Sequence, residues 1–316
     1  MSDLKATLFD IYRGTTHDGP GTRDTAFFAG CPLNCLWCHN PEGLLHKNQV
    51  WHEPKTCIGC MGCVQVCKNH AIKEGPANLL VDPDLCVACG DCVFECPTRS
   101  MNYIQKEWTL QELTKQLLRD KEYYATSGGG VTVSGGECMM QHQFVKELFK
   151  NMKENGIHTA LDTSGFTSKE ALQEVLEYTD CLLLDLKFID SDLHKRYTNV
   201  ENEIILDNAK FAAQYAKENN LEIWIRTPLI PGATATEDNI TKIGEFIRDN
   251  MDGSVSRWEL CGFNNVCLSK YQRLGLDWEY KDSKMLTRDE GNKLLDCAKA
   301  TNAANGEIYV TGLLAE

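Results

Sequence analysis

Three features are missing from this sequence, and each absence excludes a class of protein. No uninterrupted apolar run reaches the ~20 residues that a membrane-spanning helix needs. Positive charge is in deficit, since 32 Lys and Arg residues face 45 Asp and Glu residues and leave a net charge of −13; this argues against a nucleic-acid-binding surface. The first residues, Met1 to Lys5, lack the pattern of a signal peptide. We therefore expect a cytoplasmic protein that binds neither nucleic acid nor membrane.

Cysteine, by contrast, is abundant, with 16 residues in a chain of 316. Thiols stay reduced in the cytoplasm, so this many cysteines indicate metal or redox chemistry before disulfides. Most of them fall into three groups with ligand spacing. The scattered remainder are expected to be small buried hydrophobic side chains; they are Cys138, Cys181, Cys261, Cys267 and Cys297.

The first group is Cys31, Cys35 and Cys38, spaced C-x3-C-x2-C directly after the apolar run 24–30. Thiolates suit iron–sulfur clusters, zinc or copper(I). A zinc site usually takes two ligand pairs separated by a longer spacer, whereas three closely spaced cysteines suit one face of a 4Fe-4S cluster. The group has no fourth cysteine, so one iron is left open to bind and transform a ligand. A zinc site completed by His39 is the alternative.

Residues 51–100 contain two matching C-x2-C-x2-C-x3-C runs, which is an internal repeat of the bacterial ferredoxin type. In that type the fourth cysteine of each run ligates the cluster of the other run. Two 4Fe-4S clusters are predicted, one on Cys57, Cys60, Cys63 and Cys96, the other on Cys86, Cys89, Cys92 and Cys67. Glycines at positions 59, 62 and 90 would let the backbone approach the clusters. A pair of zinc ribbons is the alternative.

From residue 101 onward, apolar strand-like runs alternate with segments of helical periodicity, which predicts a parallel sheet covered by helices. Helices are expected over 110–118, 143–153, 169–177, 208–217, 239–248 and 288–300. Strands are expected over 131–134, 159–162, 181–185, 222–226 and 257–260, in addition to 24–30, which makes six units. Chemistry in such folds gathers at the carboxyl ends of the strands. The polar residues expected there are Ser134 to Glu137, Asp162 to Gly165, Asp185 to Lys187, and Arg226.

With these motifs the chain resembles the radical S-adenosylmethionine superfamily, and within it the activating enzymes of glycyl radical enzymes. The resemblance covers essentially the whole chain. It includes the three-cysteine group with Trp37, the segments 17–23, 38–42, 129–137 and 162–165, and the segments 184–187 and 226–232. It implies an α/β fold in which residues 1–50 and 101–316 form a partial (β/α)6 radical SAM barrel. Residues 51–100 would be a ferredoxin-like insert, so that the protein carries three 4Fe-4S clusters.

The function that the resemblance implies is reductive cleavage of S-adenosylmethionine to a 5′-deoxyadenosyl radical. This radical would abstract an α-hydrogen from one glycine of a partner glycyl radical enzyme. The cofactor carries the chemistry, while the protein orients it and excludes water. The insert would relay electrons from a flavodoxin or ferredoxin.

The resemblance also implies roles for individual residues. The iron held by Cys31, Cys35 and Cys38 would chelate S-adenosylmethionine. Cofactor contacts are expected from Trp37, Asn40, Gly135, Gly136, Glu137, Asp162, Thr163, Asp185, Lys187, Arg226 and Asn264. Among these, Lys187 is expected to be catalytic and, with Asp162, to contact the polar groups of the cofactor, while Thr163 and Asp185 would lie nearby at a monovalent cation. Asp18 would face the incoming glycine loop of the partner.

Three positions depart from the family pattern. Cys138 stands where a proline normally follows Gly-Gly-Glu, Asn264 stands where a histidine is usual, and Asn199 replaces a glycine. Two rival functions are a maturase of the same superfamily that modifies another protein, and a ferredoxin-type electron carrier. The three-cysteine group argues against the carrier, because a carrier needs its clusters fully ligated.

Overall fold

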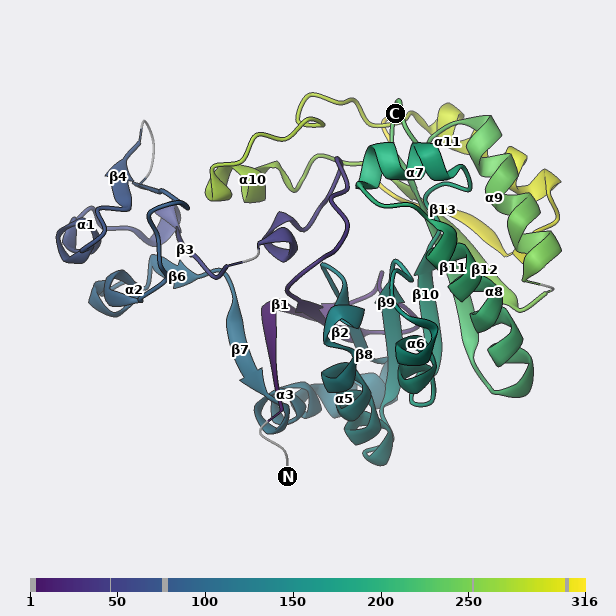
Figure 1. Ribbon diagram of the computed structural model, residues 1–316, viewed down its shortest axis with the longest axis horizontal. Coiled ribbons are helices and arrows are strands. Elements are labelled where there is room, and N and C mark those ends of the chain that lie inside the picture. The colour runs from purple at the N-terminus through teal and green to yellow at the C-terminus, as the bar shows by residue number, and fades with distance from the viewer. Residues whose placement is uncertain (1–3, 46, 76–78, 252, 305–306) are drawn as a thin grey trace.

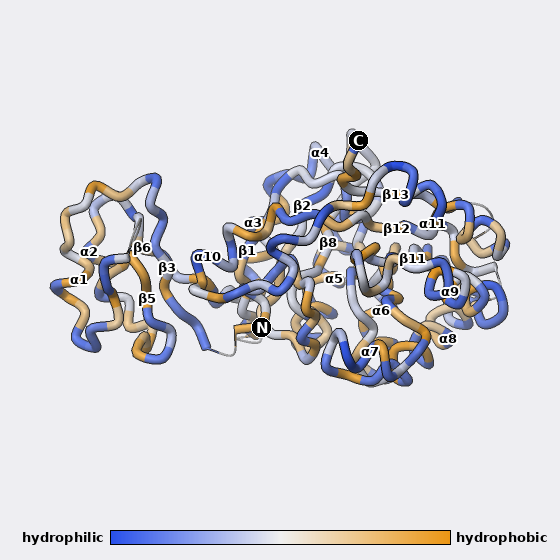
Figure 2. Tube along the Cα trace, turned by 90° about the horizontal axis from the view of Figure 1, so that it is seen from above, coloured by the Kyte–Doolittle hydropathy of each residue, from blue (hydrophilic) through white to orange (hydrophobic). Residues whose placement is uncertain are grey.

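The computed structural model describes residues 4–45, 47–75, 79–251, 253–304 and 307–316. It has a large unit built on one curved sheet and a smaller unit beside it (Figures 1 and 2). The chain enters the small unit after the first two strands and returns through β7 (Lys106–Thr109). Within the described residues, no helix is both long and apolar enough to cross a membrane.

The large sheet has nine strands in the order β13-β12-β11-β10-β9-β8-β2-β1-β7. Seven neighbouring strands are mutually parallel: β2, β8, β9, β10, β11, β12 and β13. The strand β1 pairs antiparallel with both β2 and β7. Their bounds are β1 Lys5–Thr15, β2 Arg23–Phe28, β8 Gly130–Gly135, β9 His158–Thr163, β10 Cys181–Asp185, β11 Glu222–Leu229, β12 Val255–Gly262 and β13 Ile308–Gly312. The six predicted parallel strands are confirmed, and the structure adds a seventh, β13, at the edge of the sheet.

The predicted helices are also confirmed, and they lie on the outer side of the curved sheet (Figure 1). They are α3 (Leu110–Leu117), α5 (His142–Glu154), α6 (Lys169–Leu176), α8 (Glu203–Glu218), α9 (Glu237–Asn250) and α11 (Arg288–Ala300). Short helices that the periodicity did not indicate are α4 (Lys121–Ser127), α7 (Ser191–Thr198) and α10 (Leu268–Leu274). Each of these spans only about two turns. The helices α3 and α6 are equally short, but their buried residues recur at helical spacing, as Leu113 and Leu117 do in α3.

Strand alternation divides the large sheet into two faces. One face, with Val131, Leu161 and Leu182, packs into the main apolar core beneath the helices. The opposite face carries a small apolar cluster of Ala160, Cys181, Leu183 and Trp224. Above that cluster, towards the carboxyl ends of the strands, the same face carries charged and hydroxyl side chains. This polar layer is the floor of the candidate site.

The small unit has its own apolar core, which includes Val50, Ile72 and Met101. It contains two short antiparallel pairs, β3 (Val50–His52) with β6 (Met101–Tyr103) and β4 (Ile72–Glu74) with β5 (Leu79–Val81). Each cysteine run contains one short helix that ends just before its fourth cysteine, α1 (Gly62–Val66) in the first run and α2 (Asp91–Glu95) in the second. The elements therefore repeat in two halves, as the two cysteine runs do.

Candidate active site

The loop with Cys31, Cys35 and Cys38 leaves the end of β2 and is held by backbone groups of other segments. Asn34 and Leu36 donate their N–H groups to the carbonyls of Thr198 and Tyr197, at 2.8 and 3.1 Å. On the other side, the Tyr271 hydroxyl donates to the carbonyl of Cys38 at 2.8 Å, and Trp278 Nε1 donates to that of Leu36 at 3.1 Å. Because these contacts satisfy much of the loop backbone, the loop is fixed while its thiols face a cavity.

The cavity has a volume of about 700 Å³ and lies between this loop and the carboxyl ends of the strands. All three cysteines line it. Burial raises the pKa of Cys31 to about 12, and burial together with the neighbouring cysteines raises the pKa of Cys38 further. Buried thiols of this kind ionise when a cation binds them, since a coordinating thiol is deprotonated by its metal. The donor set therefore fits an iron–sulfur cluster with three protein ligands.

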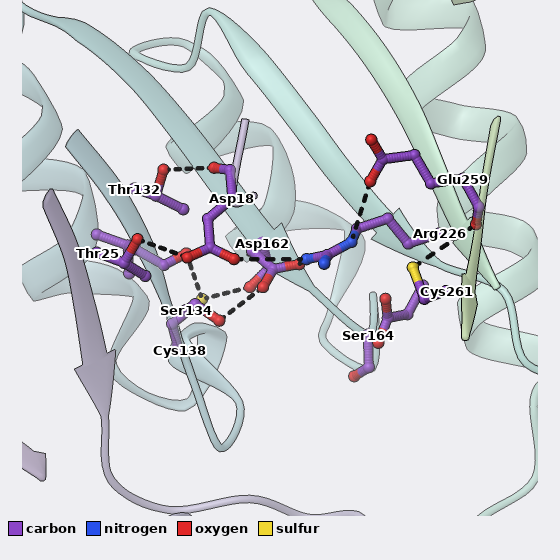
Figure 3. A network of polar contacts seen from close by, with 12 residues as sticks. Asp18, Thr25, Thr132, Ser134, Cys138, Asp162, Ser164, Arg226, Glu259 and Cys261 are labelled. Carbon is purple, nitrogen blue, oxygen red and sulfur yellow. Dashed lines mark hydrogen bonds and ion pairs between the residues drawn. The ribbon is translucent and has the colours of Figure 1, made fainter. Parts of the chain in front are cut away.

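The opposite wall of the cavity is a row of charged residues on adjacent strands. Arg226 on β11 pairs in register with Asp185 on β10 and Glu259 on β12. Its guanidinium lies 3.3 Å from Asp162 Oδ1 and 3.6 Å from Glu259 Oε2 (Figure 3). Ser134 Oγ in turn donates to Asp162 Oδ2 at 2.6 Å. Both charge signs are thus available to a ligand with separate charged groups.

Burial and neighbouring charges set the protonation of this wall. Burial raises the pKa of Asp162 to about 6, although Arg226 acts to lower it. For Lys187, burial acts to lower the pKa, but Asp185, 2.7 Å from its ammonium, and Cys35 outweigh burial and raise it. Lys187 is therefore a buried, permanently charged cation within reach of the cysteine loop.

Most of the predicted cofactor contacts come together around this cavity. Those that line it are Trp37, Asn40, Gly135, Gly136, Asp162, Thr163, Asp185, Lys187, Arg226 and Asn264. Trp37 belongs to a separate aromatic cluster, with ring centres 6.0 Å from Tyr197 and 6.4 Å from Phe188. Asn40 Oδ1 accepts from Lys270 Nζ at 2.9 Å.

Gly135 and Gly136 are required for a reason other than approach to a ligand. A Cβ on Gly135, whose φ is +128°, would lie 2.3 Å from the backbone of Phe28, and one on Gly136 would lie 2.3 Å from the carbonyl of Gly30. These two glycines let the end of β8 pack against the backbone from which the cysteine loop departs.

Two predicted site residues, Glu137 and Asp18, are not part of the cavity lining. Glu137 is outside the cavity lining and only 1% exposed; its carboxylate accepts from Met139 N at 3.0 Å, Thr163 Oγ1 at 2.7 Å and Ser164 N at 2.9 Å. Asp18 also lies outside the lining, although it adjoins the charged wall: its Oδ2 accepts from Thr25 Oγ1 at 2.8 Å, and its Oδ1 lies 4.0 Å from the Arg226 guanidinium (Figure 3). Both carboxylates thus bind the protein's own donors, which suggests that they position neighbouring segments.

The sequence reasoning missed Glu259 and Arg257, which also line the cavity and pair with each other at 2.9 Å. The available signal was charge at alternate positions of a strand that is otherwise apolar. Cys261 was expected to be a small buried hydrophobic side chain, but it is only partly buried and lines the cavity as well.

The small unit brings its eight ligand-spaced cysteines into two groups. Cys57, Cys60, Cys63 and Cys96 line one pocket. In the other group, burial raises the pKa of Cys92 to about 11, and the neighbouring cysteines that raise it further are Cys86, Cys67 and Cys89. The grouping follows the exchange of fourth cysteines that the repeat predicts.

The two halves also share an unusual backbone conformation. Positive φ occurs at Gly59 and Ala88, at Met61 and Gly90, and at His70 and Arg99, which are equivalent positions of the two runs. Most residues avoid this conformation unless the surrounding structure imposes it. Nowhere in the described parts of the chain do three or more Cys, His, Asp or Glu side chains converge on a point that could hold one metal ion.

Comparison with known proteins agrees with this geometry. A model described as the radical SAM superfamily matches residues 88–242, and one described as a 4Fe-4S dicluster domain matches residues 56–100. The first match begins at residue 88, inside the second cysteine run, so it overlaps the end of the insert and does not include the three-cysteine loop. The fold and the site thus define a radical S-adenosylmethionine enzyme with a dicluster insert.

Individual relatives show which group within the radical SAM superfamily the chain is similar to. The chain is 33% identical to a trans-4-hydroxy-L-proline dehydratase activating enzyme of Clostridioides difficile, over 98% of this chain and 100% of that protein. It is 35% identical to a choline trimethylamine-lyase activating enzyme of Oleidesulfovibrio alaskensis, over 89% and 90%. A solved domain of a pyruvate-formate lyase-activating enzyme from Bacteroides vulgatus is 27% identical, with a TM-score of 0.47, and covers 58% of this chain and 99% of that domain. The chain belongs to the glycyl radical enzyme activating enzymes of the radical SAM superfamily.

Proposed function

We propose that the cavity between the cysteine loop and the strand ends is where this enzyme prepares the radical for a glycine of its partner. The observation that carries the proposal is the placement of Cys31, Cys35 and Cys38 opposite a charged wall across a cavity of about 700 Å³. When bound, the cluster and S-adenosylmethionine supply a 5′-deoxyadenosyl radical by reductive cleavage. The residues of this chain bind the ligand, orient it and keep water out.

Different residues of the charged wall would bind different groups of S-adenosylmethionine. Lys187 and Arg226 are cations suited to the carboxylate and ribose of S-adenosylmethionine, and Asp162 is an anion suited to its cationic groups. Asp185 holds Lys187 in place at 2.7 Å. Trp37 and Asn40 lie on the loop side, where the adenine would be bound. A monovalent cation near Asp162, Thr163 and Asp185 is part of the proposal, since oxygen donors suit such an ion.

We further propose that the chain carries three 4Fe-4S clusters and is divided into a partial barrel, residues 1–50 and 101–316, and an electron-relay insert, residues 51–100. The four-cysteine groups of the insert support this role, because fully ligated clusters leave no iron free for a substrate. A flavodoxin or ferredoxin of the cytoplasm would supply the electrons. A reducing compartment suits a chain with this many free thiols.

The test uses the full chain, reconstituted with iron and sulfide without oxygen. Reduction in the presence of S-adenosylmethionine should release 5′-deoxyadenosine. With its partner glycyl radical enzyme added, a glycine-centred electron paramagnetic resonance (EPR) doublet should appear. Release of 5′-deoxyadenosine without a glycyl signal on any candidate partner would favour the maturase. Absence of both products from a protein with intact clusters would favour the electron carrier.

A further inference from the structure

His52 is a buried side chain of the insert that the proposed function has not used. Its side chain is buried, with 7% of the residue exposed, and neither ring nitrogen has a hydrogen-bond partner among the described residues. Buried polar groups nearly always have partners, because an unmet donor or acceptor is costly. The ring must therefore have a partner that the protein atoms do not provide.

The direction of the side chain follows from the strand that carries it. In β3, Val50 and His52 are buried, while Trp51 between them faces outward, with the Arg273 guanidinium 4.4 Å from its ring. Alternation along a strand sends the first and third side chains to the same side. Val50 belongs to the core of the insert, and His52 lines the pocket formed by Cys57, Cys60, Cys63 and Cys96.

The internal repeat shows that this histidine is specific to one half. His52 lies five residues before Cys57 and pairs with Met101 on β6, while Val81 lies five residues before Cys86 and pairs with Ile72 on β4. A ring with an N–H donor in the first half thus has an aliphatic counterpart in the second. The two cluster sites are alike in fold and different in hydrogen bonding.

The cysteines that cross between the halves share one backbone hydrogen bond and differ in a neighbouring side chain. Cys96 Sγ accepts from Ser100 N at 3.1 Å and lies 3.7 Å from Thr98 Oγ1. Cys67 Sγ accepts from the equivalent backbone N–H, that of Ala71, at 3.3 Å, and the position equivalent to Thr98 is Asn69. The crossing cysteine of the His52 site thus has a hydroxyl close to its sulfur, where the other half carries an amide side chain at the equivalent position.

We propose that His52 donates an N–H hydrogen bond to a sulfur of the cluster held by Cys57, Cys60, Cys63 and Cys96, and so raises its reduction potential above that of the second insert cluster. A donor stabilises the added negative charge of the reduced cluster, and hydrogen bonds to the sulfurs tune cluster potentials. His52 thereby sets the order in which an electron occupies the two clusters. This inference rests on the proposed two-cluster insert.

The test compares the wild-type holoenzyme with His52→Val, which copies the second half, and with His52→Gln, which keeps an amide N–H. Potentiometric titrations followed by EPR would resolve the clusters, and the site cluster would be recognised by its response to S-adenosylmethionine. In His52→Val the higher insert potential should become more negative while the lower one stays in place. His52→Gln should restore much of the difference. The reciprocal Val81→His should raise the lower potential.

Results that would contradict the role of His52 can be distinguished from results that would contradict the proposed insert. Unchanged potentials in a fully loaded His52→Val protein would overturn the inference and leave the proposed function standing. Loss of iron from His52→Val but not from Val81→Ala would also overturn it, because His52 would then be a ligand or a structural support. Absence of the insert clusters from the wild-type protein would instead refute the proposed two-cluster insert, on which this inference rests.

Discussion

Three substitutions relative to the family pattern have different consequences once their surroundings are known. Asn199 ends α7 with a φ of 69°. Asn adopts this conformation more readily than most residues, so the backbone accommodates Asn in place of the usual glycine. Cys138 begins a short 3-10 helix and is buried, with Sγ 3.4 Å from the carbonyl of Asp162; a proline would fit that first helical position equally well. Asn264 lines the cavity, with its Oδ1 accepting from Val266 N at 3.1 Å.

At Lys187, we expect the substitution Lys187→Met to weaken S-adenosylmethionine binding by about ten- to a hundred-fold, since a hydrogen bond to a charged group contributes about 1.5–3 kcal/mol. Equilibrium binding to the reconstituted enzyme would measure the effect. Lys242→Met is the matched control, because Lys242 makes an exposed pair with Asp238 at the same distance of 2.7 Å. Equal effects of the two variants would contradict a role for Lys187 in binding.

At Asp162, the pKa of about 6 predicts a pH dependence. Only the ionised carboxylate attracts the cationic groups of S-adenosylmethionine, so binding should be constant well above pH 6. Below that value, binding should weaken as the group is protonated, by up to about tenfold per pH unit. The dissociation constant measured between pH 5.5 and pH 7.5 would show this bend. In Asp162→Asn the bend should disappear, and its persistence would assign the titration to another group.

At the scale of elements, the cysteine loop owes its position to a segment far away in the chain. Tyr271 on α10 and Trp278 after it bond the loop backbone, and Lys270 lies 3.5 Å from Glu42, directly after the loop. The segment also reaches the insert through Arg273 above Trp51. This segment therefore joins the loop and the insert, although it has no clear periodicity of its own.

Removing the loop thiols by the combined change of Cys31, Cys35 and Cys38 to Ala should abolish cleavage of S-adenosylmethionine. Iron should fall from about twelve to about eight per chain, since each cubane cluster holds four irons. The insert clusters should persist, because their ligands are separate. Iron analysis and product chromatography check both statements. Cleavage at the wild-type rate would refute the assignment of the site, and loss of all iron would show that the clusters are not independent.

At the scale of the whole molecule, the separate position of the small unit beside the curved sheet suits a relay (Figure 2). We expect Cys89→Ala to slow activation driven by a flavodoxin or ferredoxin while affecting cleavage driven by dithionite far less. Cys297→Ala is the control, because Cys297 is a partly buried cysteine of α11 without ligand spacing. Circular dichroism must first show that the variant is folded, since cluster binding and folding are coupled. Equal loss with both reductants would refute the relay.

Much of the architecture followed from the sequence because it depends on local patterns. The six central strands are short apolar runs, and the long helices have a clear apolar period, so both were predictable within a few residues. The spacing of the cysteine runs indicates which thiols can share a cluster. The polar residues at the ends of β9, β10 and β11 were predictable because each directly follows an apolar run.

Only the tertiary structure decided how these parts meet. Glu137 was expected in the cofactor site, and the fold instead surrounds it with Thr163, Ser164 and Met139. Glu259 entered the site because β12 pairs in register with β11; its charge within an apolar strand was visible in the sequence, but its position beside Arg226 depends on that pairing. The difference between His52 and Val81 affects a cluster site only because folding places His52 in one pocket with four cysteines from both runs. Spacing along the chain determines which ligands can share a cluster, whereas the environment of that cluster depends on contacts between residues distant in sequence.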